Sequence, residues 1–238
     1  MLELQIAIAK TNKYAQRESG DTVEIVEQPL GGFAAVMADG QGSGGAAKIL
    51  SNMVVGKAIA LLKDGAKLEA VAALVHDYLY AYRGGKVTAS LVLIAADLKA
   101  GEIGVSRNSD CPIVVLDSGG VRLLDEAAGG IGTGTNAPPA LTILPIEAGM
   151  YVVAYTDGLL HAGEKYNQPL SIPPIVAFAA QQDEADAQAV ADHLLKVAMA
   201  RDRMRPDDDM SVLVIYVTEA AEQGPLVRRI IGRVPFGE

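Results

Sequence analysis

Four groups of aspartates stand beside apolar stretches of this 238-residue sequence. Asp21 precedes one stretch, Asp39 and Asp157 each follow one and are each followed by glycine, and residues 207–209 are three aspartates before the last stretch. If the fold brings these positions to one rim, several carboxylates converge, and unpaired like charges at close range are costly. Divalent cations would offset that cost, and oxygen ligands favour Mg²⁺ or Mn²⁺ over zinc or copper. Two such ions about 3.5 to 4 Å apart can activate a bridging water and neutralise a phosphoryl group under attack.

The glycine-rich stretch after Asp39 admits a second chemistry. Residues 40–45 read Gly-Gln-Gly-Ser-Gly-Gly and satisfy the pattern G-x-G-x-x-G, which occurs where glycine backbone N–H groups bind the phosphates of a nucleotide. A dinucleotide site needs a second parallel strand soon after the first helix. Here a second helix follows instead, and Asp39 would repel a pyrophosphate. These two features count against a dinucleotide site, and a nucleotide-binding enzyme is kept as the alternative function.

The elements that must position the first two aspartates form an antiparallel meander. Residues 2–9 and 21–27 alternate apolar and polar side chains, as half-buried strands do, and 33–38 is a more uniformly apolar strand. Asp21 starts one strand of a hairpin and Asp39 ends the other, so the two lie side by side. We expect both carboxylates at one edge of a sheet.

Two pairs of helices separate three groups of strands. Apolar residues at three- and four-residue spacing predict helices over 46–63, 68–82, 173–181 and 184–200. The further predicted strands are 87–96, 102–107, 112–116, 121–125, 141–144, 150–155 and 211–217, with an irregular loop over 128–139. This order predicts an α+β fold, an αββα sandwich of two antiparallel sheets with a helical pair outside each.

The composition limits the partners and the compartment. There are 29 acidic and 20 basic residues, a formal charge of −9, so we expect no affinity for nucleic acid or an anionic membrane. Cys111 is the single cysteine, which excludes an intramolecular disulfide and a cysteine-rich zinc site and suits a reducing cytoplasm. The N-terminus has no secretory signal pattern, and no run approaches the roughly 18 to 20 apolar residues of a membrane-spanning helix. We expect a cytoplasmic protein.

The chain length suits one domain with a substantial core. We expect a catalytic domain over 1–218 and a C-terminal tail over 219–238. The tail carries Arg228, Arg229 and Arg233 among apolar residues, and it either packs on the domain or serves a partner.

Five short motifs contain or accompany the aspartates. They are Ser19-Gly20-Asp21, Ala38-Asp39-Gly40-Gln41-Gly42-Ser43-Gly44, Thr88-Ala89-Ser90, Tyr155-Thr156-Asp157-Gly158-Leu159 and Asp208-Asp209-Met210-Ser211-Val212. In this order they resemble the motifs of the metal-dependent serine/threonine phosphatases, the PPM superfamily. The resemblance covers about residues 21–217 and is closest to the bacterial branch of the sporulation stage II protein E and the stress-response phosphatases. The family fold is an αββα sandwich, in agreement with the predicted order of elements.

The resemblance implies roles for the aspartates. Asp39 resembles the carboxylate that bridges two metal ions, and Gly40 the residue whose carbonyl completes one coordination sphere. Asp157 and Asp208 resemble ligands of the other ion, while Asp21 resembles an acidic residue that binds metal directly or through water. The implied cofactors are two Mn²⁺ or Mg²⁺ ions.

The implied reaction is hydrolysis of phosphoserine or phosphothreonine on a protein. A metal-bridging hydroxide attacks in line, without a phosphoenzyme. By analogy within the branch, the substrate is a small regulator, an anti-anti-sigma or STAS-domain protein. A catalytically silent binding module that keeps the fold is a further alternative.

Several other residues carry weaker expectations. Asp209 is expected to orient its neighbour rather than to bind metal. His161 follows Asp157 by one helical turn and is a candidate for contact with substrate or a metal-bound water. His76 is expected to be a surface or packed residue, and Cys111 a small buried one.

One departure from the family concerns the substrate phosphate. The large eukaryotic-type members carry an arginine on an early strand that binds this phosphate, and residues 2–9 contain none. Lys10, Lys13 and Arg17 in the next loop are candidate replacements. Solvated loop charges are the preferred interpretation of all three, because exposed lysine and arginine are common.

Overall fold

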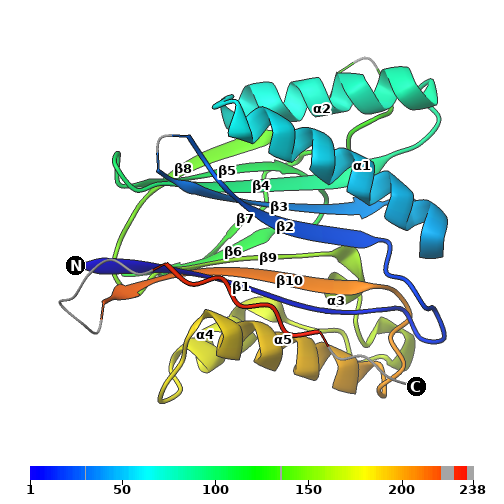
Figure 1. Cartoon of the computed structure of the whole chain (residues 1–238). Coiled ribbons are helices and arrows are strands. Elements are labelled where there is room, and N and C mark those ends of the chain that lie inside the picture. The colour runs from blue at the N-terminus through cyan, green and yellow to red at the C-terminus, as the bar shows by residue number, and fades with distance from the viewer. Residues whose placement is uncertain (30, 135, 221–227, 235–238) are drawn as a thin grey trace.

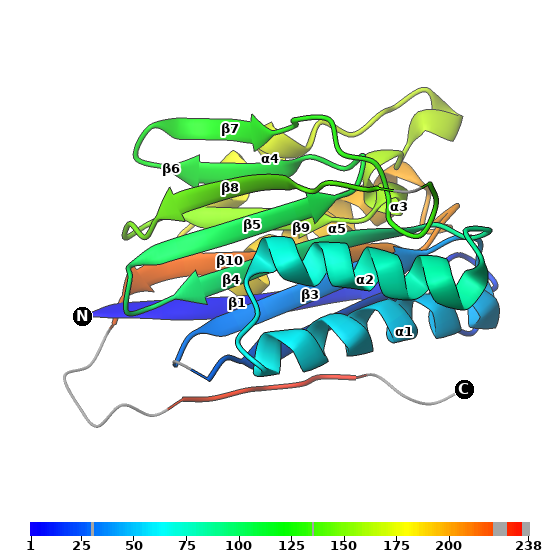
Figure 2. The ribbon, with the colours of Figure 1, turned by 90° about the horizontal axis from the view of Figure 1, so that it is seen from above.

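The computed structural model describes residues 1–29, 31–134, 136–220 and 228–234. Two five-stranded sheets pack face to face, with strand orders β1-β10-β9-β6-β7 and β2-β3-β4-β5-β8. All strand pairs within them are antiparallel. Helices α4 and α5 cover the outer face of the first sheet, and α1 and α2 cover that of the second (Figure 1; Figure 2 shows α1 and α2 from above). The predicted αββα sandwich is confirmed.

The boundaries of the elements are close to those predicted. The strands are β1 (Leu2–Thr11), β2 (Asp21–Glu27), β3 (Phe33–Gly40), β4 (Ala89–Asp97), β5 (Glu102–Asn108), β6 (Ile113–Asp117), β7 (Gly120–Leu124), β8 (Ala140–Pro145), β9 (Tyr151–Tyr155) and β10 (Met210–Glu219). The helices are α1 (Gly44–Lys63), α2 (Leu68–Arg83), α3 (Asp157–Leu160), α4 (Ile172–Ala180) and α5 (Ala187–Arg201), with a 3-10 turn, η1, at Glu164–Tyr166. The short α3 and the 3-10 turn are the elements that the hydrophobic pattern does not predict.

The central strands bury both of their faces. In β3, Val36 packs beneath α1 and α2, whereas Met37 faces the opposite sheet. In β10, Val214 packs against α4 and α5, whereas Leu213 faces the space between the sheets. Because successive strand side chains point to opposite faces, a strand between two apolar layers needs apolar residues throughout. This explains the unbroken apolar run that leads to Asp39.

Helix α1 departs from one expectation. It is the one helix in the described ranges with the length and apolar composition of a membrane span, so the statement that no stretch approaches that length is wrong. Val54, Ala58 and Leu62 are fully buried between α1, α2 and the second sheet. A core helix with such packing meets the same criteria of length and composition.

Helix α5 begins at Ala187, three residues later than predicted. The Asp186 side chain accepts a hydrogen bond from the Ala189 N–H at 2.7 Å and so caps the helix. Glu184, the predicted start, has a φ of 62°, which a right-handed helix does not contain.

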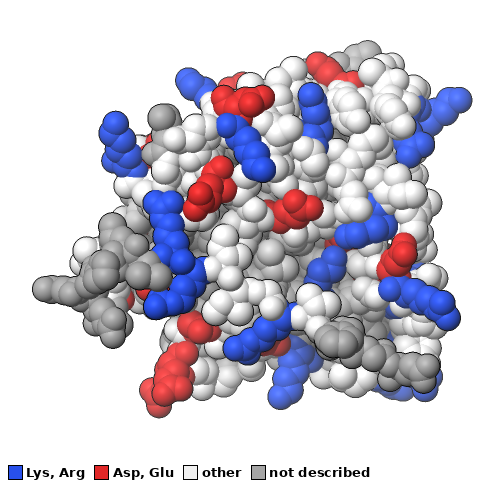
Figure 3. Space-filling view, viewed as in Figure 1, with Lys and Arg blue, Asp and Glu red and all other residues white. Residues whose placement is uncertain are grey.

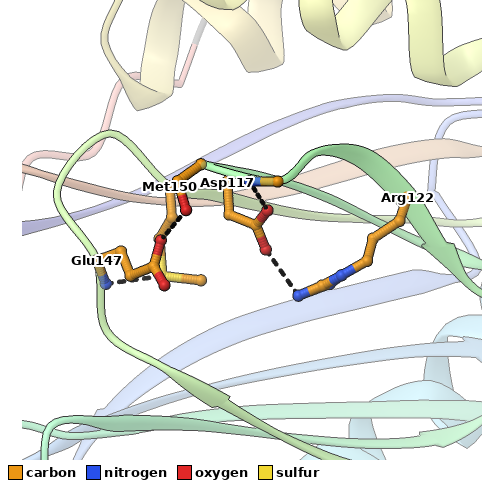
Figure 4. A network of polar contacts seen from close by, with 6 residues as sticks. Asp117, Arg122, Glu147 and Met150 are labelled. Atoms are coloured by element: carbon orange, nitrogen blue, oxygen red, sulfur yellow. Dashed lines mark hydrogen bonds and ion pairs between the residues drawn. The ribbon is translucent and has the colours of Figure 1, made fainter.

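The ends of β6 and β8 farthest from the aspartates are joined by a polar network (Figure 4). Arg122 donates to the Asp117 carboxylate at 2.7 Å, and the Ser118 hydroxyl donates to Glu147 at 2.8 Å. The Glu147 N–H in turn contacts the Met150 sulfur at 3.4 Å. These contacts tie the turn after β6 to the turn before β9.

Residues 228–234 run along the outside of the edge formed by β1 and β2 (Figures 1 and 2). Arg228 forms an exposed ion pair with Glu27 at 3.3 Å and lies over the Phe33 ring. Strand β10 continues to Glu219, so it includes the first residue of the predicted tail. The division into a domain and a tail stays a prediction.

Charged side chains of both signs are intermixed on the face drawn in Figure 3. A basic stripe is the usual electrostatic feature of nucleic-acid binding, and this face shows none in the described residues.

Candidate active site

An open pocket of about 560 Å³ lies at the rim where the aspartate-bearing strands meet. Its lining includes Asp39 and Gly40 from the end of β3, Asp157 from the start of α3, and Asp208 just before β10. The two sheets contribute one group each, because β3 belongs to the second sheet and β9 and β10 belong to the first. Carboxylates that are far apart in sequence therefore face a common space.

Asp21 and Asp39 are direct cross-strand partners in the β2–β3 hairpin, as the hairpin geometry predicts. Asp39 lines the pocket, whereas Asp21 is fully buried and is not part of the lining. Asp21 Oδ2 accepts hydrogen bonds from Ser211 in β10 of the opposite sheet at 2.7 Å and from Thr156, which directly follows β9 of that sheet, at 2.9 Å. Asp21 Oδ1 has no partner in the described part of the chain. The carboxylate therefore links the two sheets and leaves one buried oxygen unsatisfied.

The glycines after Asp39 and Asp157 permit close approach of other backbone segments. A Cβ on Gly40 would lie 2.3 Å from the carbonyl oxygen of Ala47 in α1. A Cβ on Gly158 would lie 2.2 Å from the carbonyl oxygen of Asp209. Only glycine fits at such separations. The two Asp-Gly pairs thus hold the carboxylates against α1 and against the segment that carries Asp208.

Asp209 holds the loop between β1 and β2 against the rim. It is buried, and its two carboxylate oxygens accept hydrogen bonds from the N–H groups of Lys13 at 2.8 Å and Gly20 at 2.7 Å. Its own N–H donates to Asp208 Oδ1 at 3.0 Å. These contacts suit an orienting residue, and that role for Asp209 stays a prediction.

The crowded carboxylates shift one another's ionisation. Burial, with further contributions from Asp21 and Asp157, raises the pKa of Asp39 to about 9. Burial raises the pKa of Asp21 to about 6 against the lowering effect of the Ser211 hydroxyl, and burial also raises the pKa of Asp208. A divalent cation would favour the ionised forms of these groups.

The donor set fits partly hydrated magnesium or manganese ions. In residues 1–29, 31–134, 136–220 and 228–234, no group of three or more Asp, Glu, His or Cys side chains forms a metal site unaided. Mg²⁺ keeps several waters and binds proteins through one or two carboxylates, and Mn²⁺ favours the same ligand types. Asp39, Asp157 and Asp208, with the Gly40 carbonyl, could hold such ions, and Asp21, the cross-strand partner of Asp39, has one buried oxygen without a partner in the described residues.

The pocket also has walls that the sequence motifs do not indicate. Ser109 and Asp110 belong to the turn between β5 and β6, and Gly130 belongs to the loop before β8. The antiparallel order of the strands could have predicted this placement, because β4 runs away from the rim and β5 returns to it. The turn after β5 must therefore lie at the same rim as Asp39.

Buried polar groups anchor the glycine-rich wall. The Arg107 guanidinium donates to the carbonyls of Ser109 and Glu126. His76 Nδ1 accepts from the Gly132 N–H at 3.1 Å, so His76 is a packed residue that supports this loop. Thr88 Oγ donates to the Ile131 carbonyl at 3.1 Å.

Cys111 is buried, as expected, and burial raises the pKa of its thiol to about 12.

His161 lies outside the pocket lining. Its exposed ring pairs with the exposed Glu164 carboxylate at 3.0 Å, at the end of α3. In this geometry its polar contact is with a surface side chain.

The three candidate cations have different surroundings, and Lys10 belongs to β1 rather than to the loop that contains Lys13 and Arg17. Lys10 is exposed as a residue, but its Nζ donates to the Asp21 carbonyl oxygen at 2.9 Å, so the ammonium group is not solely solvated. Partial desolvation of this ammonium group and the neighbouring Lys48, which donates to the same oxygen at 2.8 Å, lower the pKa of Lys10. Arg17 is exposed, as expected. Lys13 lines the pocket.

The nucleotide-binding alternative does not meet its topological requirement. The strand that follows α1 and α2 is β4, and β4 pairs with β3 in antiparallel register. A dinucleotide site of the G-x-G-x-x-G type needs a parallel neighbour. The glycines here instead allow α1 to approach Asp39.

Comparisons with solved structures show the same fold. The phosphatase domain of Bacillus subtilis SpoIIE with a fragment of its regulatory domain matches with a TM-score of 0.78 at 19% identity, over 90% of this chain and 63% of that one. A serine/threonine phosphatase of *S. agalactiae* matches with a TM-score of 0.74 at 18% identity, over 91% and 100%. The catalytic domain of PstP in complex with two manganese ions matches with a TM-score of 0.69 at 18% identity, over 92% and 100%. This chain therefore spans less than two thirds of the SpoIIE chain that it matches.

A comparison with curated protein sequences found no significant match. Comparison with protein families gave a match to "Stage II sporulation protein E (SpoIIE)" over residues 29–218. This range contains four of the five motifs and the pocket's aspartates. The chain belongs to the SpoIIE family.

Proposed function

We propose that this protein hydrolyses phosphoserine or phosphothreonine on another protein, with two Mg²⁺ or Mn²⁺ ions as cofactors. The convergence of Asp39, Asp157 and Asp208 on one open pocket, in a chain of the SpoIIE family, carries the proposal. Its fold also matches that of PstP, which was solved with two manganese ions. When bound, such ions lower the pKa of a water and neutralise charge on a phosphoryl group.

The chain's own residues would bind the ions and keep the rim in place. Asp39, Asp157, Asp208 and the Gly40 carbonyl supply the oxygen ligands. Asp21 joins the two sheets below them through Thr156 and Ser211. In the reaction, the oxygen of water forms a bond to phosphorus and the ester bond breaks. The serine or threonine oxygen leaves and gains a proton, and inorganic phosphate is the second product.

The proposed substrate is a small regulatory phosphoprotein of the anti-anti-sigma or STAS type, in the cytoplasm. The resemblance to the sporulation and stress-response branch supports the class of substrate. The single cysteine, which is buried, suits a reducing compartment. The openness of the pocket to solvent suits a phosphorylated side chain presented by a folded partner.

The decisive variant is Asp39→Asn. We expect the purified protein to hydrolyse p-nitrophenyl phosphate and a phosphoserine protein with Mn²⁺ or Mg²⁺, and EDTA to abolish the activity. Asp39→Asn should lower the rate by at least about 100-fold, beyond the 10- to 100-fold typical of residues that only support a ligand. Asp192→Asn, an exposed aspartate of α5, is the matched control and should retain full activity.

Two results would contradict the proposed phosphatase activity. Hydrolysis of neither substrate with either metal, together with no metal binding in calorimetry, would exclude a metal-dependent phosphatase. Metal binding without hydrolysis would instead favour the catalytically silent binding module.

A further inference from the structure

The pocket contains a single cationic side chain among its lining residues. Four of those residues carry carboxylates, Asp39, Asp110, Asp157 and Asp208, and Lys13 alone is basic. We propose that Lys13 binds the non-bridging oxygens of the substrate phosphate. This inference rests on the proposed function and assigns a phosphate-binding residue to that site.

The main chain of Lys13 is fixed to the segment that carries Asp208. The Lys13 N–H donates to Asp209 Oδ1 at 2.8 Å, and the next residue, Tyr14, donates its N–H to the Pro206 carbonyl at 2.8 Å. The Gln16 N–H donates back to the Lys13 carbonyl at 3.0 Å and closes the turn. The half-buried Lys13 side chain thus starts from a defined position at the rim.

The ammonium group of Lys13 is close to the proposed metal ligands. It favours the ionised form of the Asp208 carboxylate and so opposes the effect of burial on the pKa of Asp208. In the described residues no hydrogen-bond acceptor holds Lys13 Nζ. The group can therefore donate to a ligand in the pocket without breaking an internal hydrogen bond.

The other nearby cations are excluded by their contacts. Lys10 and Lys48 both donate to the Asp21 carbonyl oxygen, at 2.9 and 2.8 Å, and Lys48 also donates to Thr22 Oγ1 at 2.9 Å. Their ammonium groups hold β2 to β1 and α1. Arg17 belongs to the same loop as Lys13 but is exposed and is not part of the pocket lining.

The chemistry of the ligand suits a group of this kind beside the metal ions. A phosphate monoester is a dianion at neutral pH, and the carboxylates of the pocket repel it. Lysine provides a compact positive charge with three donors, and hydrogen bonds between ionised partners are about twice as strong as neutral ones. Lys13 would bind the oxygens that stay on phosphorus while the ester bond breaks.

The test compares Lys13→Met and Lys13→Arg with Arg17→Met, a matched loss of charge in the same loop. For each variant we would measure kcat and KM for p-nitrophenyl phosphate at saturating Mn²⁺, inhibition by inorganic phosphate, and Mn²⁺ affinity by calorimetry. We expect Lys13→Met to weaken phosphate inhibition and to lower kcat/KM by about 10- to 100-fold. Its Mn²⁺ affinity should be equal to that of the parent or higher, since a positive charge beside Asp208 is removed. Lys13→Arg should restore most of the phosphate inhibition, and Arg17→Met should resemble the parent.

Two outcomes would overturn the assignment. One is unchanged phosphate inhibition in Lys13→Met. The other is a parallel loss of Mn²⁺ affinity and activity, which would indicate a structural role. If the parent protein hydrolyses no phosphoester, the proposed function fails, and the assignment is then decided by direct titration of inorganic phosphate into the Mn²⁺-loaded protein. Weaker binding to Lys13→Met than to Arg17→Met supports it, and equal binding refutes it.

Discussion

At the scale of single residues, the site depends on glycines as much as on aspartates. Gly40 and Gly158 each follow a pocket carboxylate, and each occupies a place where another backbone segment leaves no room for a Cβ. The Asp-Gly dipeptide is common in turns because glycine tolerates unusual backbone angles. In this protein the glycines allow α1 to approach Asp39 closely and the segment with Asp208 to approach Asp157.

We expect Gly158→Ala to destabilise the fold by about 1 to 3 kcal/mol, the usual range for overpacking. The new Cβ would press against the Asp209 carbonyl at 2.2 Å and move Asp157 away from Asp208, so Mn²⁺ affinity should fall as well. Gly56→Ala is the control, because no atom lies within 4 Å of a Cβ at that exposed position of α1. It should raise stability by roughly 0.5 to 1 kcal/mol. Urea unfolding and calorimetry measure both effects, and equal losses in the two variants would contradict the packing argument.

The raised carboxyl pKa values give the metal-free protein a pH-dependent stability. The pKa of Asp39 rises from 3.8 to about 9 on folding, so between these values the folded protein binds more protons than the unfolded chain. Stability then falls as pH rises through this window. We expect the EDTA-treated protein to lose thermal stability between pH 5 and pH 8.5, and Mn²⁺ to restore it. Asp39→Asn should show a shallower fall, and an identical slope in both proteins would contradict this origin.

At the scale of elements, the two outer helices on the first sheet begin differently. The Asp186 side chain caps α5, whereas Ser171 precedes α4 without a side-chain capping bond. Helix α5 buries Val190 and Leu194 completely against the sheet, so its first turn anchors a large apolar contact.

We expect Asp186→Ala to lower the free energy of unfolding by about 1 kcal/mol, as for other lost N-caps. Ser171→Ala removes a side chain of similar exposure without losing a cap, and its effect should stay within about 0.5 kcal/mol. Urea denaturation curves compare the two. Equal effects would mean that the cap does not decide where α5 begins.

At the scale of the whole molecule, the described part of the tail adds little to the stability of the sandwich. Arg228 pairs with Glu27, but both side chains are 59% exposed, and exposed ion pairs contribute at most about 1 kcal/mol. Ile230, Ile231 and Val234 are also largely exposed. The three apolar layers of the core are complete without them.

A chain that ends after Ala220 should therefore keep its fold and its hydrolysis of p-nitrophenyl phosphate. The cut retains β10 and the hydrogen bond from the Ala220 N–H to the Met1 carbonyl at 2.8 Å. We expect a loss of less than about 1 kcal/mol in stability. Loss of cooperative unfolding or of activity would place residues beyond 220 within the catalytic domain.

The sequence predicted the sandwich because local patterns carry most of its information. Apolar periodicity distinguishes the strands from the helices, and the order of elements leaves few ways to cover two sheets. The starts of α5 and β4 were misplaced by two or three residues, since a cap at Asp186 and contacts of Thr88 with the loop after β7 override the apolar pattern.

By itself, the sequence determined the order of the elements, the pairing of Asp21 with Asp39, and the glycines that follow two of the aspartates. These features depend on neighbours in the chain. Only the tertiary structure decided that Asp21 lies beneath the pocket and that Ser109 and Asp110 join its walls. It also decided that Lys10 holds a carbonyl while Lys13 faces the aspartates. The hydrogen bond that fixes Lys13 spans 196 residues to Asp209, and such a contact exists only once the first and last strands, β1 and β10, have paired.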